Sequence, residues 1–265
     1  RYINRRLEQM NGITVEDMMA LQNDNFSIKA EEGAPALLRL VQTEGLSEQQ
    51  KQWLEQVRNW DFRFEKDAKA PVIFEYWFWK AYELTFDEVY KIQEKDSVDV
   101  QFPEDWLFIE LLATQPTHEI FDNANTDKIE IARDIVTEAF KVACSELREE
   151  HGGEIVWSAY KSTRINHLAR IDAFNSEILD NGGYGDAPNA VKRSHGPSWR
   201  MVVELGERTK AWGVYPGGQS GNPGSKFYDS MVQQWAMGKY NELFFMKDKE
   251  DRGQPVLFEF KIQKK

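Results

Sequence analysis

The chain has 265 residues, of which 33 are Lys or Arg and 44 are Asp or Glu, so its formal net charge is −11 at pH 7. An acidic surface repels the phosphate backbone, and no Lys/Arg cluster is longer than two or three residues, so we expect no nucleic-acid partner. Nine Trp and an aromatic share of 13% exclude a disordered chain, and no apolar run approaches the roughly 20 residues of a membrane helix.

The beginning of the chain is unusual for a complete protein. It starts at Arg1, without a Met and without a signal peptide, in sequence that already favours a helix. We therefore expect the chain to be the interior of a longer protein. Because Cys144 is the one cysteine, the chain can form neither an internal disulfide nor a multi-cysteine zinc site. The cysteine content therefore does not indicate a cellular compartment.

The N-terminal part of the chain predicts successive helices. Thr14 is followed three residues later by Asp17, and Ser47 by Gln50, which is the spacing of a capping box. Pro103 is expected in the first turn of a further helix.

The most clearly predicted helix begins near Thr126. Apolar residues recur with a period of about 3.6 from Ile129 to Leu147. Gly152 and Gly153 are expected to end this helix.

The segment 71–86 carries seven aromatic residues. A helix that is aromatic on all sides packs on several sides, so it is either the core of the helical layer or a docking surface. We favour the core interpretation.

After Gly153 the sequence becomes richer in Gly, Pro and β-formers. Residues 198–205, 209–215 and 255–262 are predicted strands, and residues 225–240 are predicted to form a helix that ends at Gly238. The first strand places four apolar side chains on one side: Trp199, Met201, Val203 and Leu205.

These elements predict an α+β fold, with a mostly helical region at 1–153 and a sheet-forming region at 154–265. Two or three antiparallel strands are marginal alone. We expect them to extend a larger sheet outside this chain, so that both regions belong to one larger domain.

Ser220 is the one candidate nucleophile, in the loop 216–225. The loop departs from a nucleophile elbow because its second Gly comes one residue early, which favours a tight structural turn. A triad of Ser220, His195 and Asp186 remains an alternative, although no spacing demands it.

The sequence predicts no metal site. The four histidines lack the partner at i+3 or i+4 that helical metal pairs have, and a structural or exposed role is expected for each: His118, His151, His167 and His195. The loop 180–189 lacks the alternating acids and the closing Glu of a calcium loop, so we expect a solvated turn.

Six segments, taken together, resemble the C-terminal end of the β chain in the penicillin acylase (penicillin amidase) family. They cover nearly the whole chain and stand in the family's order: ALQNDNFSIKAEEGAPALL (20–38), NWDFRFEKDAKAPVIFEYW (59–77), WSAYKSTRINHL (157–168), GGYGDAPNA (182–190), HGPSWRMVVEL (195–205) and VYPGGQSGNPGSKFYDSMVQQWAMGKY (214–240).

The resemblance implies an N-terminal-nucleophile hydrolase with an αββα sandwich, of which this chain is a part. In that family the N-terminal Ser of the β chain attacks a linear amide, and a backbone amide and an Asn form the oxyanion hole. The Ser, the Asn and a nearby Arg all precede Arg1, so no catalytic residue is assigned here.

The resemblance also implies a small-molecule amide substrate, no cofactor, and a periplasmic or secreted location. It implies two partners, namely the α chain and the N-terminal part of the β chain. This chain alone is predicted to be inactive and to complete the sheet. Two alternatives remain: a non-catalytic binding or assembly module, and a self-contained hydrolase that uses Ser220.

Overall fold

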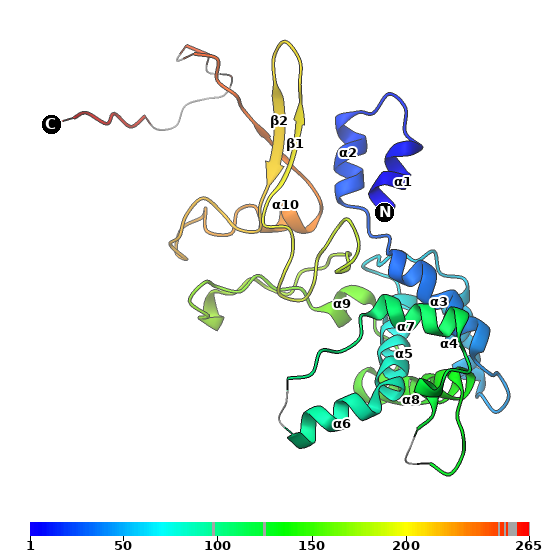
Figure 1. The fold of residues 1–265 in the computed structure, drawn as a ribbon. Helices are drawn as coiled ribbons and strands as arrows, with labels where there is room; N and C mark the ends of the chain where they lie inside the picture. Colours follow the sequence, from blue (N-terminus) through cyan, green and yellow to red (C-terminus); the bar gives the residue numbers. More distant parts are fainter. Residues whose placement is uncertain (97–98, 124–125, 249, 252, 254–258, 265) are drawn as a thin grey trace. The chain divides into compact units, whose positions relative to one another are not determined.

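The computed structural model describes residues 1–96, 99–123, 126–248, 250–251, 253 and 259–264 (Figure 1). The chain forms two compact units. The helical unit comprises Asp24–Thr163 and Asp180–Arg193, and the sheet unit comprises Arg1–Asn23, Arg164–Leu179 and Ser194–Lys265.

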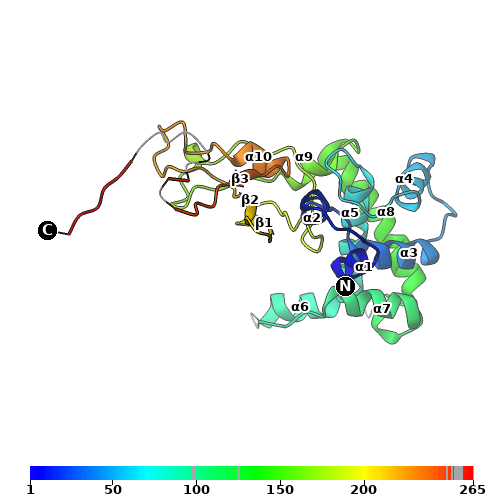
Figure 2. The same cartoon turned by 90° about the horizontal axis from the view of Figure 1, so that it is seen from above.

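The helical unit is built around α5 (Ala70–Thr85), which packs most extensively against α8 (Ala132–His151). Helices α3, α4, α5, α7 and α8 lie together in both views (Figures 1 and 2). The remaining elements of this unit are α3 (Ile28–Leu40), α4 (Glu48–Arg58), α6 (Asp87–Asp96), α7 (Asp105–Thr114), the 3₁₀ turn η1 (Glu119–Phe121) and α9 (Trp157–Lys161).

The core interpretation of the aromatic segment is confirmed. Phe74, Trp77 and Phe78 of α5 are fully buried, and Trp77 Nε1 donates to the carbonyl oxygen of Val136 in α8 at 2.9 Å. Trp79 is the exception, because 43% of it is exposed. Burying the large rings on several sides of one helix supplies much of the apolar area that stabilises this unit.

Both predicted capping boxes are present. Thr14 caps α2 (Val15–Gln22) and Ser47 caps α4, each accepting from the backbone three residues on. The start predicted at Pro103 is two residues early, since α7 begins at Asp105.

The start predicted near Thr126 is wrong, because α8 begins at Ala132. Thr126 instead closes a loop, with its hydroxyl donating to the carbonyl oxygen of Lys128 at 2.9 Å and to Glu130 at 2.7 Å. Ile129 points outward and is 80% exposed. The predicted end is correct, since Gly152 has a positive φ of 65°.

The sheet unit holds a three-stranded antiparallel sheet in the order β1-β2-β3. Met201 of β1 (Arg200–Glu204) lies opposite Gly213 of β2 (Lys210–Val214), and Ala211 lies opposite Leu243 of β3 (Asn241–Leu243). The other elements of this unit are α1 (Tyr2–Glu8), α2, the 3₁₀ turn η2 (Asp172–Phe174) and α10 (Val232–Ala236).

The side of β1 that carries most of its apolar residues is not the buried side. Val202 and Arg200 of β1 are buried, whereas the predicted apolar side is exposed among the described residues. That exposed side carries Trp199, Met201, Val203 and Leu205.

The predicted helix at 225–240 is much shorter than expected. Ser225 Oγ accepts from the backbone of Phe227, and this turn delays the helix until Val232. The chain ends α10 with Gly238 at a φ of +68°, as predicted. In the predicted strand 255–262, residues 255–258 lie outside the described residues and residues 259–262 form no strand.

The predicted fold class is confirmed: the chain is α+β, mostly helical at first and then a small antiparallel sheet. The division at residue 153 stays a prediction.

Candidate functional site

The loop that holds Ser220 is a tight turn. Ser220 Oγ accepts from the backbone N–H of Asn222 at 3.1 Å, and the Ser220 N–H donates to the carbonyl oxygen of Phe227 at 3.1 Å. At Gly218 a Cβ would overlap the carbonyl oxygens of Phe227 and Tyr228. Gly218, two residues before Ser220, is therefore required by close backbone approach.

The triad residues are not brought together by any hydrogen bond of the described chain. His195 Nδ1 lies 3.1 Å from the hydroxyl oxygen of Ser194, its neighbour. Asp186 belongs to the helical unit, whereas Ser220 and His195 belong to the sheet unit. The triad thus stays a hypothesis without a supporting contact.

Ser220 shares a groove of about 410 Å³ in the sheet unit with His167 and Asp229, a grouping that the sequence did not suggest. Tyr228 forms part of its wall and donates to the carbonyl oxygen of Phe174 at 3.0 Å. His167 Nδ1 accepts from the backbone of its own loop at 3.3 Å, which is a local structural role.

The remaining histidines also have local roles. His118 Nδ1 accepts from the backbone N–H of Ile120 at 3.1 Å, and His151 packs edge-on against Tyr76 and Tyr160. Across the described ranges, no group of three or more His, Cys, Asp or Glu side chains is placed to hold a metal ion.

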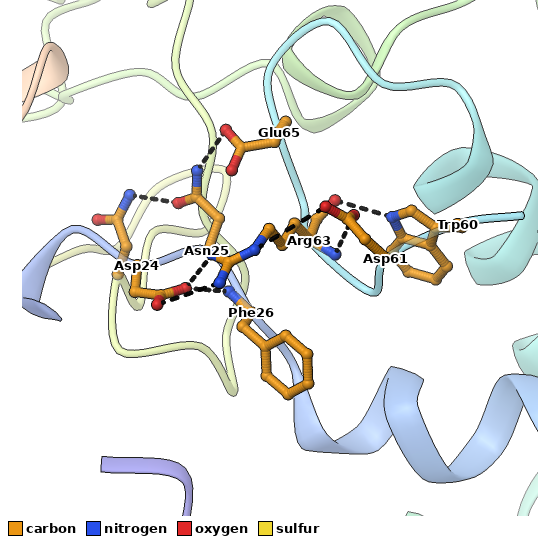
Figure 3. A network of polar contacts seen from close by, with 8 residues as sticks. Asp24, Asn25, Phe26, Trp60, Asp61, Arg63 and Glu65 are labelled. Atoms are coloured by element: carbon orange, nitrogen blue, oxygen red, sulfur yellow. Dashed lines mark hydrogen bonds and ion pairs between the residues drawn. The ribbon is translucent and has the colours of Figure 1, made fainter. Parts of the chain in front are cut away.

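A polar network joins distant segments of the helical unit (Figure 3). Asn25 Nδ2 donates to Glu65 at 2.9 Å, while Asn25 Oδ1 accepts from Asn189 at 2.8 Å. Asp24 is ion-paired with Arg63, which also lies above the Phe26 ring. The segments 20–38, 59–77 and 182–190 therefore meet at one place.

The first residues of the segment 157–168, which belong to the helical unit, join the same place. Trp157 Nε1 donates to the carbonyl oxygen of Gly183 at 2.8 Å, and the ammonium of Lys161 donates to Asn181 and to the carbonyl oxygen of Gly182. A Cβ on Gly182 would lie 2.8 Å from the carbonyl oxygen of Phe64. These motif residues act as structural anchors of the helical unit.

The two remaining segments meet in the sheet unit. Arg200 Nη1 donates to the carbonyl oxygen of Trp235 at 2.7 Å, and Trp235 Nε1 donates to that of Pro197 at 2.9 Å. The Arg200 guanidinium also lies above the Trp235 ring. These contacts fix β1 against α10.

A cavity of about 540 Å³ is the other site of interest, and it lies wholly in the helical unit. On its wall, the carboxyl of Glu75 accepts from the Tyr184 hydroxyl at 2.6 Å and from Trp79 Nε1 at 3.3 Å. Lys29 is buried beside it, 2.8 Å from an oxygen of Asp105.

Burial shifts the acid–base properties of this wall. Desolvation raises the pKa of Glu75, although the Lys29 ammonium opposes the shift. Desolvation and the nearby Glu75 carboxylate raise the pKa of Tyr184 well above 10, so its hydroxyl remains a donor. A buried carboxyl is costly unless other groups stabilise it, and Glu75 accepts two hydrogen bonds and lies near the Lys29 ammonium.

Neither Glu75 nor Lys29 was selected as a site residue from the sequence. The available signal was the carboxylate of Glu75 between Phe74 and Tyr76 in the aromatic run 71–86, which is conspicuous in a helix that buries most of its surface. Lys29, in contrast, stands in an ordinary amphipathic pattern, and only the fold reveals its burial.

Comparison with known proteins assigns the chain to a family of hydrolases. Residues 1–252 match the family model described as "Penicillin amidase", so the chain belongs to the penicillin amidase family. The comparison with curated proteins found no match.

Among solved structures, a thermostable penicillin G acylase from Alcaligenes faecalis, in orthorhombic form, matches with a TM-score of 0.58 and 14% identity. The match covers 99% of this chain and 52% of that chain, so this chain spans about half the length of its structural relative. The likeness shows that the chain shares the fold of part of that penicillin G acylase.

Within the described residues, no helix is both long enough and apolar enough to cross a membrane.

Proposed function

We propose that this chain is the C-terminal part of the β chain of a penicillin amidase-type enzyme that hydrolyses linear amides. The observation that carries the proposal is the family match over residues 1–252, combined with coverage of only about half of the solved relative. The helical region 1–153 and the sheet-forming region 154–265 then belong to one larger domain.

The chemistry in this proposal belongs to residues outside the chain. The hydroxyl of an N-terminal Ser attacks the amide carbonyl, and its own α-amine transfers the proton to the leaving amine. Water then hydrolyses the ester of the acyl-enzyme and releases a carboxylic acid. The role of this chain is structural: it completes the sheet and supports the layers around the active site.

The exposed side of the small sheet supports this role. Trp199, Met201 and Val203 are each more than 40% exposed on one side of β1, and Leu205 continues the row. Exposed contiguous apolar surface is typical of an interaction site. We propose that the N-terminal part of the β chain and the α chain cover this side.

The tight turn at Ser220 supports the same assignment. Its hydroxyl is used as an acceptor for a local backbone N–H, and Gly218 is required by backbone packing. We propose no cofactor, a small-molecule amide as the substrate, and a periplasmic or secreted location as in the family.

The experiment is active-site labelling of the complete protein with a serine-directed sulfonyl fluoride, followed by peptide mass spectrometry. We expect one labelled peptide, at the N-terminal Ser of the β chain, and no label on residues 1–265. Label on Ser220 would favour the self-contained hydrolase, and a complete protein without amidase activity would favour the binding module.

A further inference from the structure

On the inner wall of the cavity of the helical unit, the buried side chains of Lys29 and Glu75 already have partners. The Lys29 ammonium pairs with Asp105 and lies 4.0 Å from the centre of the Trp79 ring and 4.4 Å from that of Phe78. Glu75 accepts from Tyr184 and Trp79. Lys161 is also buried on this wall, and its ammonium donates to Asn181 and to the carbonyl oxygen of Gly182.

The same arrangement disfavours a cationic ligand. Aromatic rings attract cations over their faces, but here the Lys29 ammonium already occupies the faces of Phe78 and Trp79.

The mouth of the cavity carries two basic side chains, whereas the chain as a whole is acidic. Lys192 and Arg193 are adjacent, exposed and line the cavity, and within the described ranges neither side chain forms an ion pair or a hydrogen bond. Asp186 is the acid that shares the mouth with them, and it lies outside ion-pair distance of both. In a protein of net charge −11, two adjacent cations without acidic partners are conspicuous.

The rest of the cavity offers flat apolar surface. Trp79 is 43% exposed although it belongs to the core helix, and Tyr160 and Val191 contribute further apolar wall. A volume of about 540 Å³ lies in the range of pockets that hold small organic molecules.

We propose that this cavity is a binding site for a small aromatic carboxylate. The carboxylate pairs with Lys192 and Arg193 at the mouth, and the ring lies against Trp79 and Tyr160. Arg binds a carboxylate through two parallel N–H donors, and Lys adds a point charge.

The test is isothermal titration calorimetry of the complete protein with 2-naphthoate, with neutral 2-naphthamide and with inorganic phosphate. We expect 2-naphthoate to bind at least about tenfold more tightly than either of the others, since one charge-assisted pair is worth about a factor of ten. Equal affinity for 2-naphthoate and 2-naphthamide would overturn the anion site, and tighter binding of phosphate would overturn the aromatic one.

Variants locate the binding. The double variant Lys192→Ala/Arg193→Ala should weaken 2-naphthoate by about tenfold or more, whereas Lys51→Ala/Arg58→Ala on α4 removes the same charges elsewhere and should leave it unchanged. Because the substituted side chains are exposed, circular dichroism and melting temperature should match the wild type.

A second pair of variants tests the ring. Trp79→Ala should weaken 2-naphthoate, and Trp106→Ala, which removes the 61% exposed Trp of α7, should not. If 2-naphthoate binds with all four variants unchanged, it binds elsewhere and the proposal fails, whether or not the complete protein is an amidase. Absence of binding to the wild type at millimolar concentration also refutes it.

Discussion

Asn25→Ala is the substitution that probes the meeting point of the motif segments most sharply. The Asn25 side chain is buried, and its amide donates to Glu65 at 2.9 Å and accepts from Asn189 at 2.8 Å. Each lost hydrogen bond costs about 1 kcal/mol, and taking the Asn25 acceptor from the buried Asn189 amide adds about 1–3 kcal/mol. We expect the free energy of unfolding to fall by about 2–4 kcal/mol.

The assay is urea denaturation followed by Trp fluorescence and, in parallel, by circular dichroism. Asn59→Ala is the matched control, since Asn59 is an exposed helix cap whose amide makes one bond, to the carbonyl oxygen of Glu55 at 2.9 Å. Its loss should cost less than about 1 kcal/mol. If Asn25→Ala is no more destabilising than Asn59→Ala, the network in Figure 3 does not hold the segments together.

Three further outcomes are expected. Gly218→Ala should lower the free energy of unfolding by about 1–3 kcal/mol in the same urea titration, because the new Cβ would overlap the Phe227 carbonyl oxygen. Ser220→Ala should cost at most about 1 kcal/mol, since it removes one local hydrogen bond. A larger loss for Ser220→Ala than for Gly218→Ala would contradict the structural turn. Burial raises the pKa of Glu75 above its ordinary value of 4.5, so the folded state holds this proton more tightly than the unfolded state. The stability of the wild type relative to Glu75→Gln should therefore decline as pH rises from about 4 through the folded pKa, and a difference that is constant with pH would refute this. Burial raises the pKa of Cys144 to about 12, so at pH 8 only about one thiol in ten thousand is ionised, and a disulfide reagent should label it at a measurable rate only after unfolding.

Structural features formed by residues close together in the sequence are predicted well. The capping boxes at Thr14 and Ser47 are complete within four residues, so no distant contact can override them. The aromatic helix was also predictable, since so many rings at neighbouring positions can be covered only by a core.

Features that depend on distant contacts were not predictable. The apolar period continues back to Ile129, yet hydrogen bonds from Thr126 to Lys128 and Glu130 hold this stretch in a loop. The alternation in β1 identifies two sides but not the buried one, which contacts made by Arg200 and Val202 decide.

The candidate sites show the same limit. The sequence suggested Ser220 because of the glycines around it, but those glycines serve a close backbone approach. Conversely, Glu75 and Lys29 come from different helices, α5 and α3, and only the packing of these helices places both on one cavity wall. The family can be inferred from the sequence because six motifs occur in the family's order. That order can be recognised although the contacts made by each motif cannot be predicted from the sequence.

The central claim is that this chain completes a penicillin amidase-type enzyme whose nucleophile lies outside it. The most direct measurement is hydrolysis of a chromogenic phenylacetyl amide by the isolated 265 residues, by the complementary α chain plus N-terminal part of the β chain, and by their mixture. We predict turnover in the mixture alone, unchanged by Ser220→Ala. Turnover by the isolated chain that Ser220→Ala abolishes would contradict the claim.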